Sequence, residues 1–217
     1  MRPSNPMNQS WRGGCSIPKT AAAAWPKARS SAWPTASASP RGRAGLSCSM
    51  KKSLKSGSRG GMITVTILMV GKTRQRFIQE GLAFYQKRLQ PFLHLTLTSV
   101  REEKEAGGLA AATVKVREGE RLRAQIPPRA NVIALTPQGR EFTSEEFAAW
   151  LTRRELESRP LTFLIGGHLG LDEQTLAAAQ ERLALARLTL THELSRLVLL
   201  EQLYRAMTIK CGHPYHV

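Results

Sequence analysis

The residues best suited to chemistry lie in the last part of the chain. An imidazole titrates near neutral pH and can act as a base, and a guanidinium can stabilise a negative charge that develops during a reaction. A tyrosine can orient such groups through its hydroxyl or its ring. The candidates of these kinds are His192, Arg196, Arg205, Tyr215 and His216.

Structural explanations stay open for part of this set. Glu201 and Arg205 stand four residues apart with Glu first, which an ion pair on a helix surface explains. His192 can equally be a helix-start residue bonded to the backbone. Tyr215 and His216 are harder to explain by packing, because chain ends usually fray. They make more sense if the tail docks into a site.

A glycine-rich segment, Gly166-Gly167-His168-Leu169-Gly170, forms the second candidate site. Backbone without Cβ atoms lets N–H groups approach a ligand closely. The segment lacks the GxGxxG spacing and no Lys-Ser/Thr follows it, so a simple turn is an equal alternative. Two further segments, 136–140 and 191–193, are expected at the same carboxyl edge of a sheet, where open α/β folds bind ligands.

The elements that would position these groups alternate between strand-like and helix-like patterns from Met62 onward. This order is typical of an α/β domain with a mainly parallel sheet. The expected strands cover residues 63–70, 93–100, 131–135, 161–165 and 185–190.

A helix is expected after each strand. The second, at about 109–126, has an apolar stripe that passes through Val116 and Gly119. The third begins with a capping box formed by Thr143 and Glu146. The last, at about 193–210, is apolar over more than one face, which predicts that part of it packs on a second protomer.

The first 61 residues differ sharply in composition from the rest. They hold 11 Lys or Arg, 12 Ser and no Asp or Glu, whereas residues 62–217 carry 21 basic and 16 acidic residues. The first segment cannot bury enough apolar surface to fold and is expected to be disordered. Three interpretations stay open: an over-extended start before Met62, a targeting segment and an RNA-tethering arm. Residues 62–217 are the right size for one domain.

Composition also argues against several classes of protein. No apolar run approaches the roughly 18 residues of a membrane span, so a soluble protein is expected. Cys15, Cys48 and Cys211 form no paired framework, which favours a reducing compartment. Cys211, His213 and His216 share one tail without a second ligand group, so no metal site is expected.

Four ordered motifs carry a family resemblance. They are Leu164-Ile165-Gly166-Gly167-x-x-Gly170-Leu171, Leu188-Thr189-Leu190-x-His192-x-x-x-Arg196, Glu201-Gln202-Leu203-Tyr204-Arg205-Ala206 and His213-x-Tyr215-His216, and the opening Ile63 to Lys72 matches as well. Together they resemble the rRNA large subunit methyltransferase H family of the SPOUT superfamily, whose members methylate N3 of a pseudouridine in 23S rRNA. The resemblance spans residues 62–217. Thr191, where the family usually has Pro, and His168-Leu169 depart from the pattern.

This resemblance implies a trefoil-knotted α/β fold that works as a homodimer and binds S-adenosylmethionine. The implied cofactor contacts are Leu135, Gly166, Gly167, Gly170, Ala186, Arg187, Leu188, Thr189, Leu190 and Thr191. Arg205 would stabilise the developing anion, with His216 as the better candidate base and Tyr215 positioning it. His192 and Arg196 would orient the substrate or bind a phosphate.

The charge of the folded region bears on the substrate. A net +5 for residues 62–217 is modest for an enzyme that binds naked RNA through its phosphates. It favours shape recognition. This agrees with the substrate that the resemblance implies, rRNA already within the assembled ribosome, and the resemblance also leads us to expect a bacterial cytoplasm. Two alternatives stay open: a catalytically silent ribosome assembly factor with the same fold, and a SPOUT methyltransferase acting on tRNA. The preference for pseudouridine over uridine and the identity of the general base are left open as well.

Overall fold

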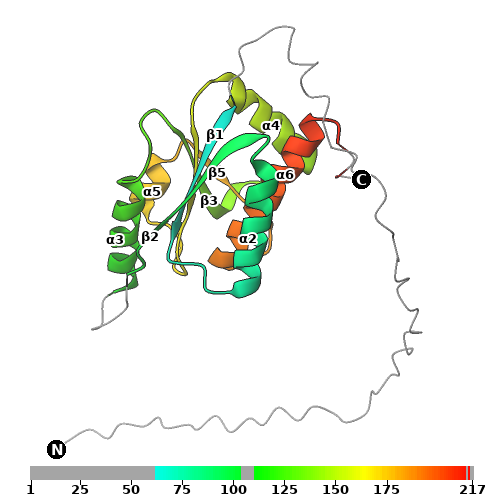
Figure 1. Cartoon of the computed structure of the whole chain (residues 1–217). Coiled ribbons are helices and arrows are strands. Elements are labelled where there is room, and N and C mark those ends of the chain that lie inside the picture. The colour runs from blue at the N-terminus through cyan, green and yellow to red at the C-terminus, as the bar shows by residue number, and fades with distance from the viewer. Residues whose placement is uncertain (1–61, 104–109, 214, 216–217) are drawn as a thin grey trace, which may run out of the picture. The chain divides into compact units, whose positions relative to one another are not determined.

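A five-stranded parallel sheet organises the part of the chain that the structure describes. The computed structural model describes residues 62–103, 110–213 and 215, and the interpretations of residues 1–61 fall outside it. The strands are β1 (Ile63–Val70), β2 (Leu93–Val100), β3 (Asn131–Arg140), β4 (Leu161–Ile165) and β5 (Glu181–Leu183). Their spatial order is β2-β1-β4-β3-β5 (Figure 1). This architecture confirms the expected α/β class with a mainly parallel sheet, while the knot stays a prediction.

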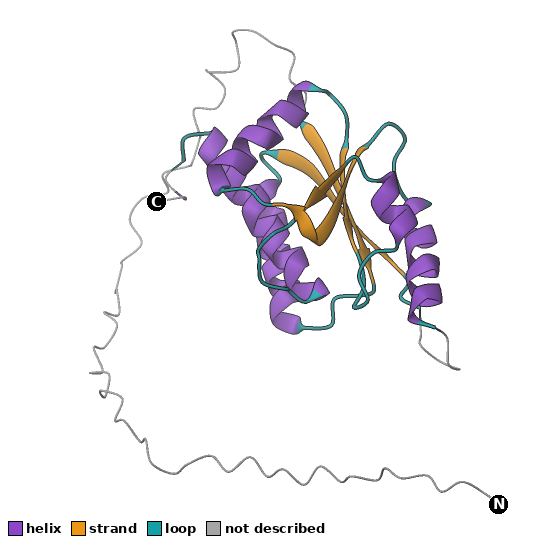
Figure 2. Ribbon diagram, turned by 180° about the vertical axis from the view of Figure 1, so that it is seen from behind, coloured by secondary structure: helices purple, strands orange, loops and turns teal. Residues whose placement is uncertain are grey.

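Helices cover both faces of the sheet (Figure 2). They are α2 (Arg76–Leu89), α3 (Ala111–Arg123), α4 (Ser144–Leu156), α5 (Glu173–Ala178) and α6 (His192–Lys210). On one face α2 and α4 both pack on α6, and on the other α3 packs on α5. The side chains of β1 alternate between the two cores: Val65 and Ile67 face the α6 side, and Leu68 faces the α3 side. Burial on both faces explains why this strand reads as a continuous apolar run.

The strand order reverses between β1 and β4. The two strands are hydrogen-bonded neighbours, yet the helix after β1 (α2) and the helix after β4 (α5) lie on opposite faces. In open parallel sheets such a change of face leaves a gap outside the carboxyl ends of the strands, and ligands bind there. The glycine-rich segment follows β4 directly and therefore lies at this position.

The strand expected at residues 185–190 is wrong. The fifth strand ends at Leu183, and residues 184–191 belong to no helix or strand. The pairing of this part of the chain with β3 is set earlier, at Gln180. Its side-chain oxygen accepts from the Val132 N–H, and its backbone N–H donates to the Val132 carbonyl. The apolar residues of 185–190 mimicked a buried strand, although Leu188 is 80% exposed.

The segment expected as a loop at 136–140 is assigned to β3, but it does not continue the regular ladder. Leu135 and Arg140 both pair with Leu183, so the register shifts between them. The intervening residues therefore form a bulge at the carboxyl edge of the sheet.

Two helices illustrate what local sequence does and does not determine. At α4 the Thr143 hydroxyl accepts from the Glu146 N–H at 3.2 Å, and the Glu146 carboxylate accepts from the Thr143 N–H at 2.8 Å, which confirms the capping box. The predicted stripe of α3 is wrong by part of a turn, because Val116 is 36% exposed while Val114 and Glu118 are buried.

Gly119 lets α3 approach α5 closely. A Cβ built at this position would lie 1.9 Å from Oδ1 of Asp172 and 2.5 Å from the Thr175 hydroxyl. Asp172 is itself buried and accepts from Arg123 Nη1 at 2.9 Å and from the Thr175 hydroxyl. Burial alone would raise the pKa of Asp172, but the hydrogen bonds from Thr175 and Arg123 hold it below its usual value. A fixed, charged network therefore occupies the space that a side chain at 119 would need.

We expect Gly119→Ala to destabilise the domain, although helix propensity alone predicts a gain of about 1 kcal/mol for this change. Forcing a methyl group against Asp172 should lower the free energy of unfolding by about 1–3 kcal/mol, a typical overpacking cost. Urea unfolding of both proteins measures the difference. Glu120→Ala, at the next and exposed position of α3, is the matched control and should change little. A more stable Gly119→Ala protein would contradict the packing described here.

Candidate active site

The glycine-rich segment folds back on itself after β4. Gly167 and Gly170 form an isolated antiparallel bridge, with the Gly170 N–H donating to the Gly167 carbonyl at 3.1 Å. Gly170 has a φ of +82°, which favours glycine. A Cβ at Gly166 would lie 2.6 Å from the Gly170 backbone, so a side chain there would open the turn. Both the turn and the close approach therefore require glycine.

Gly167 faces a buried carboxylate that the sequence analysis missed. A Cβ at Gly167 would lie 2.9 Å from Oε2 of Glu118, which is 2% exposed. Oε1 of Glu118 accepts from the Glu103 N–H at 2.9 Å, and Oε2 has no hydrogen-bond partner among the described residues. Burial raises the pKa of Glu118. The available signal was an acidic residue midway between Val114 and Leu122 on one helical face.

Arg196 occupies the other face of the sheet at the end of β1. It is fully buried, its Nη1 donates to the Thr73 hydroxyl at 2.7 Å, and its Nη2 donates to the Val70 carbonyl. These bonds tie α6 to the turn that follows β1. In this protomer Arg196 thus positions the turn, and the expected contact with substrate stays a prediction.

His192 is the first residue of α6. Thr191 caps the helix, because its hydroxyl accepts a hydrogen bond from the Leu194 N–H at 3.3 Å. Burial lowers the pKa of the half-buried His192 imidazole, and the charges of Arg196 and His168 add to this effect. The lowered pKa favours the neutral imidazole at pH 7. Glu193 accepts from the N–H groups of Arg74 and Gln75 at 3.1 Å, which fixes the start of α6 to the start of α2.

Tyr215 docks on the far end of α6. Arg205 donates through Nε and Nη2 to Oε1 of Glu201, at 3.0 and 2.7 Å. Its guanidinium lies 5.2 Å from the centre of the Tyr215 ring, and the Tyr215 and Tyr85 hydroxyls are 3.3 Å apart. The Tyr204 and Tyr215 rings meet edge to face at 4.8 Å.

This contact has two consequences. The surface ion pair expected for Glu201 and Arg205 is present, and it also holds the guanidinium beside Tyr215. Burial, together with the hydrogen bond to Tyr85, raises the pKa of Tyr215 to about 12. The phenol therefore stays neutral at pH 7 and can orient a neighbour but not remove a proton. His216 lies outside the described residues.

The expected cofactor residues all lie at the carboxyl edge of the sheet. Leu135 is half-buried near the bulge of β3, the glycine-rich segment follows β4, and residues 186–191 connect β5 to α6. Within that connection Arg187 forms an ion pair with Glu141 at 3.1 Å, and Leu188 is exposed. Backbone N–H and C=O groups in such a connection are not committed to a ladder and can bind a ligand.

The two halves of the predicted site are far apart in one protomer. His192 lies at the carboxyl edge of the sheet, and Arg205 follows thirteen residues later on the same helix. At 1.5 Å per residue these positions are about 20 Å apart. The structure thus brings together Leu135, the glycines and His192 at one end, and Arg205 with Tyr215 at the other.

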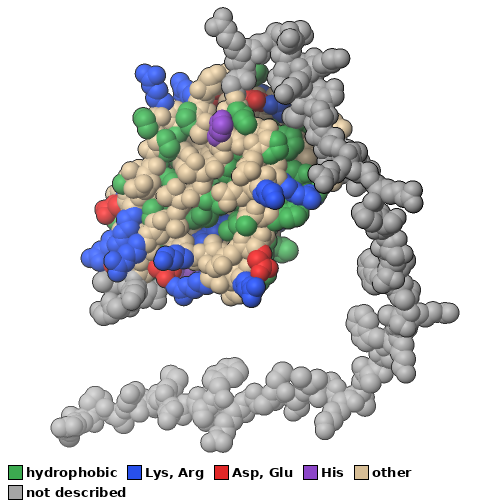
Figure 3. Space-filling view, viewed as in Figure 1, with side chains coloured by type: hydrophobic (Ala, Val, Ile, Leu, Met, Phe, Trp, Pro, Cys, Tyr) green, Lys and Arg blue, Asp and Glu red, His purple; other side chains and the backbone are tan. Residues whose placement is uncertain are grey.

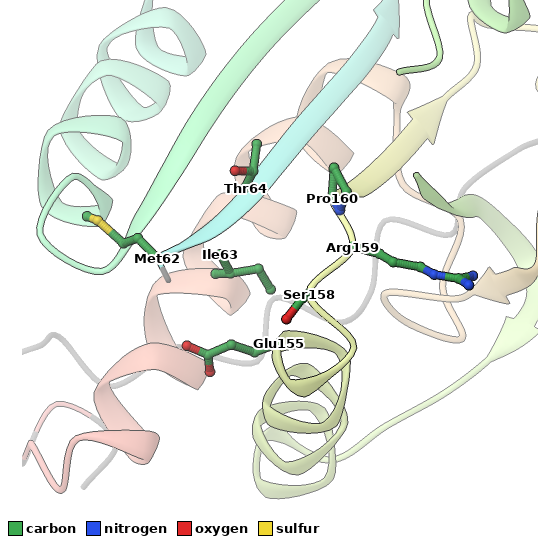
Figure 4. Close-up of a pocket in the computed structure, with 7 residues that line it drawn as sticks. All are labelled: Met62, Ile63, Thr64, Glu155, Ser158, Arg159 and Pro160. Atoms are coloured by element: carbon green, nitrogen blue, oxygen red, sulfur yellow. The ribbon is translucent and has the colours of Figure 1, made fainter. Parts of the chain in front are cut away.

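Surface features distinguish the two edges of the sheet. On the face shown in Figure 3, Lys and Arg side chains gather along the lower edge, which is the carboxyl edge of the strands. A cavity of about 160 Å³ lies at the opposite, amino edge, between β1 and the turn after α4 (Figure 4). None of the predicted site residues lines that cavity.

Among the described residues, no helix is long and apolar enough to cross a membrane, and no group of three or more His, Cys, Asp or Glu could hold a metal ion.

Comparison with known proteins identifies the family. Residues 63–216 match the family model described as "Predicted SPOUT methyltransferase". Proteins named "Ribosomal RNA large subunit methyltransferase H" from Carboxydothermus hydrogenoformans and Desulfitobacterium hafniense are each 44% identical, over 70% and 71% of this chain and 98% and 99% of their own. A relative of the same name from Listeria monocytogenes is also 44% identical, over 71% of this chain and 99% of its own.

A solved structure, entitled "Crystal Structure of Probable Methyltransferase from Bordetella pertussis Tohama I", aligns at 13% identity with a TM-score of 0.44. The alignment covers 67% of this chain and 95% of that one. With a family match that runs from β1 to the docked tail, and 44% identity to relatives it covers almost completely, the chain belongs to the SPOUT methyltransferase family.

Proposed function

We propose that this protein is an S-adenosylmethionine-dependent methyltransferase that methylates N3 of a pseudouridine in 23S rRNA of the assembled large subunit, in the bacterial cytoplasm. The printed names of its relatives support the rRNA substrate. The observation that carries the proposal is the docked tail, in which Tyr215 packs against the Arg205 guanidinium. A chain end that only frayed would not be held by Arg205, Tyr85 and Tyr204 together.

The carboxyl edge fits the cofactor that the family uses. Leu135 and Leu190 supply apolar surface for an adenine, and the backbone of residues 184–191 can hydrogen-bond its edge. The turn at Gly166 and Gly167 gives close access to the backbone, and an unpartnered buried oxygen of Glu118 lies against it. Bound there, S-adenosylmethionine would supply an electrophilic methyl group.

Methylation of a uracil-type N3 requires the loss of a proton whose pKa lies well above neutral. The site must therefore stabilise the developing anion or supply a base. Arg205 is suited to the first role, because its hydrogen bond to Glu201 raises its pKa and keeps it charged. His216 is the proposed base, since the Tyr215 phenol beside it does not ionise near neutral pH. Tyr215 would then position the base or stack on it.

Separation of the two halves supports a homodimer. One helix holds His192 and Arg205 about 20 Å apart, so a single protomer cannot bring both to one nucleotide. One line along α6 has residues spaced by four, three and four positions, and we call it the outer stripe of α6. It consists of Leu194, Val198, Glu201 and Arg205. Leu194 and Val198 are only half-buried and lie outside both core clusters. A partner packed antiparallel on this stripe would place its Arg205 beside the first protomer's His192.

Removing either proposed catalytic group should slow methyl transfer without weakening cofactor binding. We expect His216→Ala to lower the single-turnover rate on ribosomes that lack the modification by about 100-fold. Arg205→Ala should be at least as damaging, and Arg205→Lys should restore little, because an ammonium does not replace a planar guanidinium. Arg153→Ala, an exposed arginine on α4, is the control. Full activity in both His216→Ala and Arg205→Ala would remove these residues from the site.

The dimer gives a separate prediction. Leu199 and Leu203 are fully buried in the protomer core, so the interface is best tested at the half-buried Val198. We expect Val198→Glu to convert a dimer into a monomer in sedimentation experiments at micromolar concentration, and Val116→Glu, on exposed α3 surface, to leave the dimer intact.

Mixing inactive subunits tests whether the site is shared. If each site takes His192 from one subunit and Arg205 from the other, a random mixture of His192→Ala and Arg205→Ala subunits should regain about a quarter of wild-type activity. A wild-type protein that sediments as a monomer, or a mixture with no gain, would exclude a shared site.

The silent assembly factor is the alternative from another functional class. It predicts ribosome binding without uptake of S-adenosylmethionine, which calorimetry distinguishes. A tRNA substrate would be recognised by methylation of tRNA in place of ribosomes deficient in the modification.

A further inference from the structure

Glu118 is a buried acid that neither the proposed catalysis nor the core explains. Glu118 is 2% exposed, and its Oε2 lies against Gly167. A Cβ built on Gly167 would lie 2.9 Å from this oxygen. Only Oε1 is satisfied, by the Glu103 N–H at 2.9 Å. No described residue donates to Oε2. The unpartnered oxygen therefore points at the turn proposed to bind the cofactor.

Nearby cations are engaged elsewhere. Arg117 and Arg121 both pair with Glu103, which is more exposed than Glu118, and Arg121 also donates to the Arg101 carbonyl at 3.0 Å. Glu102 adds negative charge near Glu118, while His168 and Arg121 attract its carboxylate electrostatically and donate no hydrogen bond to Oε2. A buried carboxylate without a partner costs free energy, and such groups in proteins are usually paired with a cation. The missing partner has to be positively charged or a hydrogen-bond donor.

We propose that Glu118 binds the positively charged end of S-adenosylmethionine, its ammonium or its sulfonium group, through Oε2 beside Gly167. This inference rests on the proposed cofactor. The adenine and ribose of that cofactor carry no positive charge at neutral pH, so the methionine end is the part that matches a buried carboxylate. Glu118 is thereby a specificity residue that favours charged nucleosides over neutral ones of the same shape.

Three nucleosides separate the charges. S-adenosylmethionine carries both the ammonium and the sulfonium, S-adenosylhomocysteine carries the ammonium alone, and 5′-methylthioadenosine carries neither. Glu118→Gln keeps the shape of the side chain and an acceptor for the Glu103 N–H but removes the charge. Calorimetric titration of full-length wild-type and Glu118→Gln protein with each nucleoside gives six dissociation constants to compare.

We expect Glu118→Gln to weaken S-adenosylmethionine by about 10- to 100-fold, the usual size of a hydrogen bond to a charged group, and 5′-methylthioadenosine by less than about twofold. An equal loss for S-adenosylhomocysteine identifies the ammonium as the bound group, and no loss for it identifies the sulfonium. Equal weakening of all three nucleosides, or of none, would overturn the proposal, because a purely structural role in the turn does not discriminate by charge.

Two controls protect this comparison. Glu120→Gln makes the same chemical change at an exposed position of α3 and should alter none of the constants. If Glu118→Gln lowers the melting temperature strongly, Glu118→Asp serves in its place. It keeps the charge on a shorter side chain and should still weaken binding of the charged nucleosides more than binding of the neutral one. A wild-type protein that binds none of the three would reject the proposed function itself, whereas normal wild-type binding with an unselective Glu118→Gln variant rejects only the role of Glu118.

Discussion

The stiffness of α6 is the constraint on which the rest of the arrangement depends. The helix runs without interruption from His192 to Lys210, a length of about 28 Å at 1.5 Å per residue. Its first turn is fixed by Arg196 and Glu193 to the elements that follow β1, and its later turns hold Arg205 and the docked Tyr215. A rod anchored in this way cannot bend its two ends together. The distance between the carboxyl edge of the sheet and Arg205 is thus fixed within one chain, and the proposed shared site would need a second copy to close it.

Much of the fold was predictable because it depends on local patterns. Three strands were predicted with their observed bounds, and β3 was predicted at its start but runs on to Arg140. The capping box at Thr143 was also predictable, because it needs only neighbours in sequence. The prediction of a strand at 185–190 was wrong because pairing in a sheet depends on the neighbouring strand, here β3. Gln180 binds Val132 and fixes the register before that segment begins. Nothing within residues 185–190 reports an interaction made several residues earlier with β3.

The candidate site divides in the same way. Docking of Tyr215 was expected from its motif, and the structure places it near both Arg205 and Tyr85. The burial of Arg196 could not, since an arginine four residues after His192 reads equally well as a surface group. Glu118 was missed because the stripe of α3 was assigned through Val116, which turned the acidic residue away from the core. An error of part of a helical turn was enough to hide it.

The two buried charges at the end of β1 are best considered together. Arg196 approaches from the α6 side and Glu118 from the α3 side, and each retains one polar atom without a described partner, Nε in one case and Oε2 in the other. Arg196 nonetheless donates hydrogen bonds to two acceptors, Thr73 and Val70. Glu118 has only one donor for two oxygens. Gly119, next to it, brings α3 against Asp172 and fixes the helix, so Glu118 cannot move toward solvent without breaking that contact. The packing that costs the protein an unpaired carboxylate is therefore the same packing that holds it ready beside Gly167, which is the condition a cation-binding group must meet before its ligand arrives.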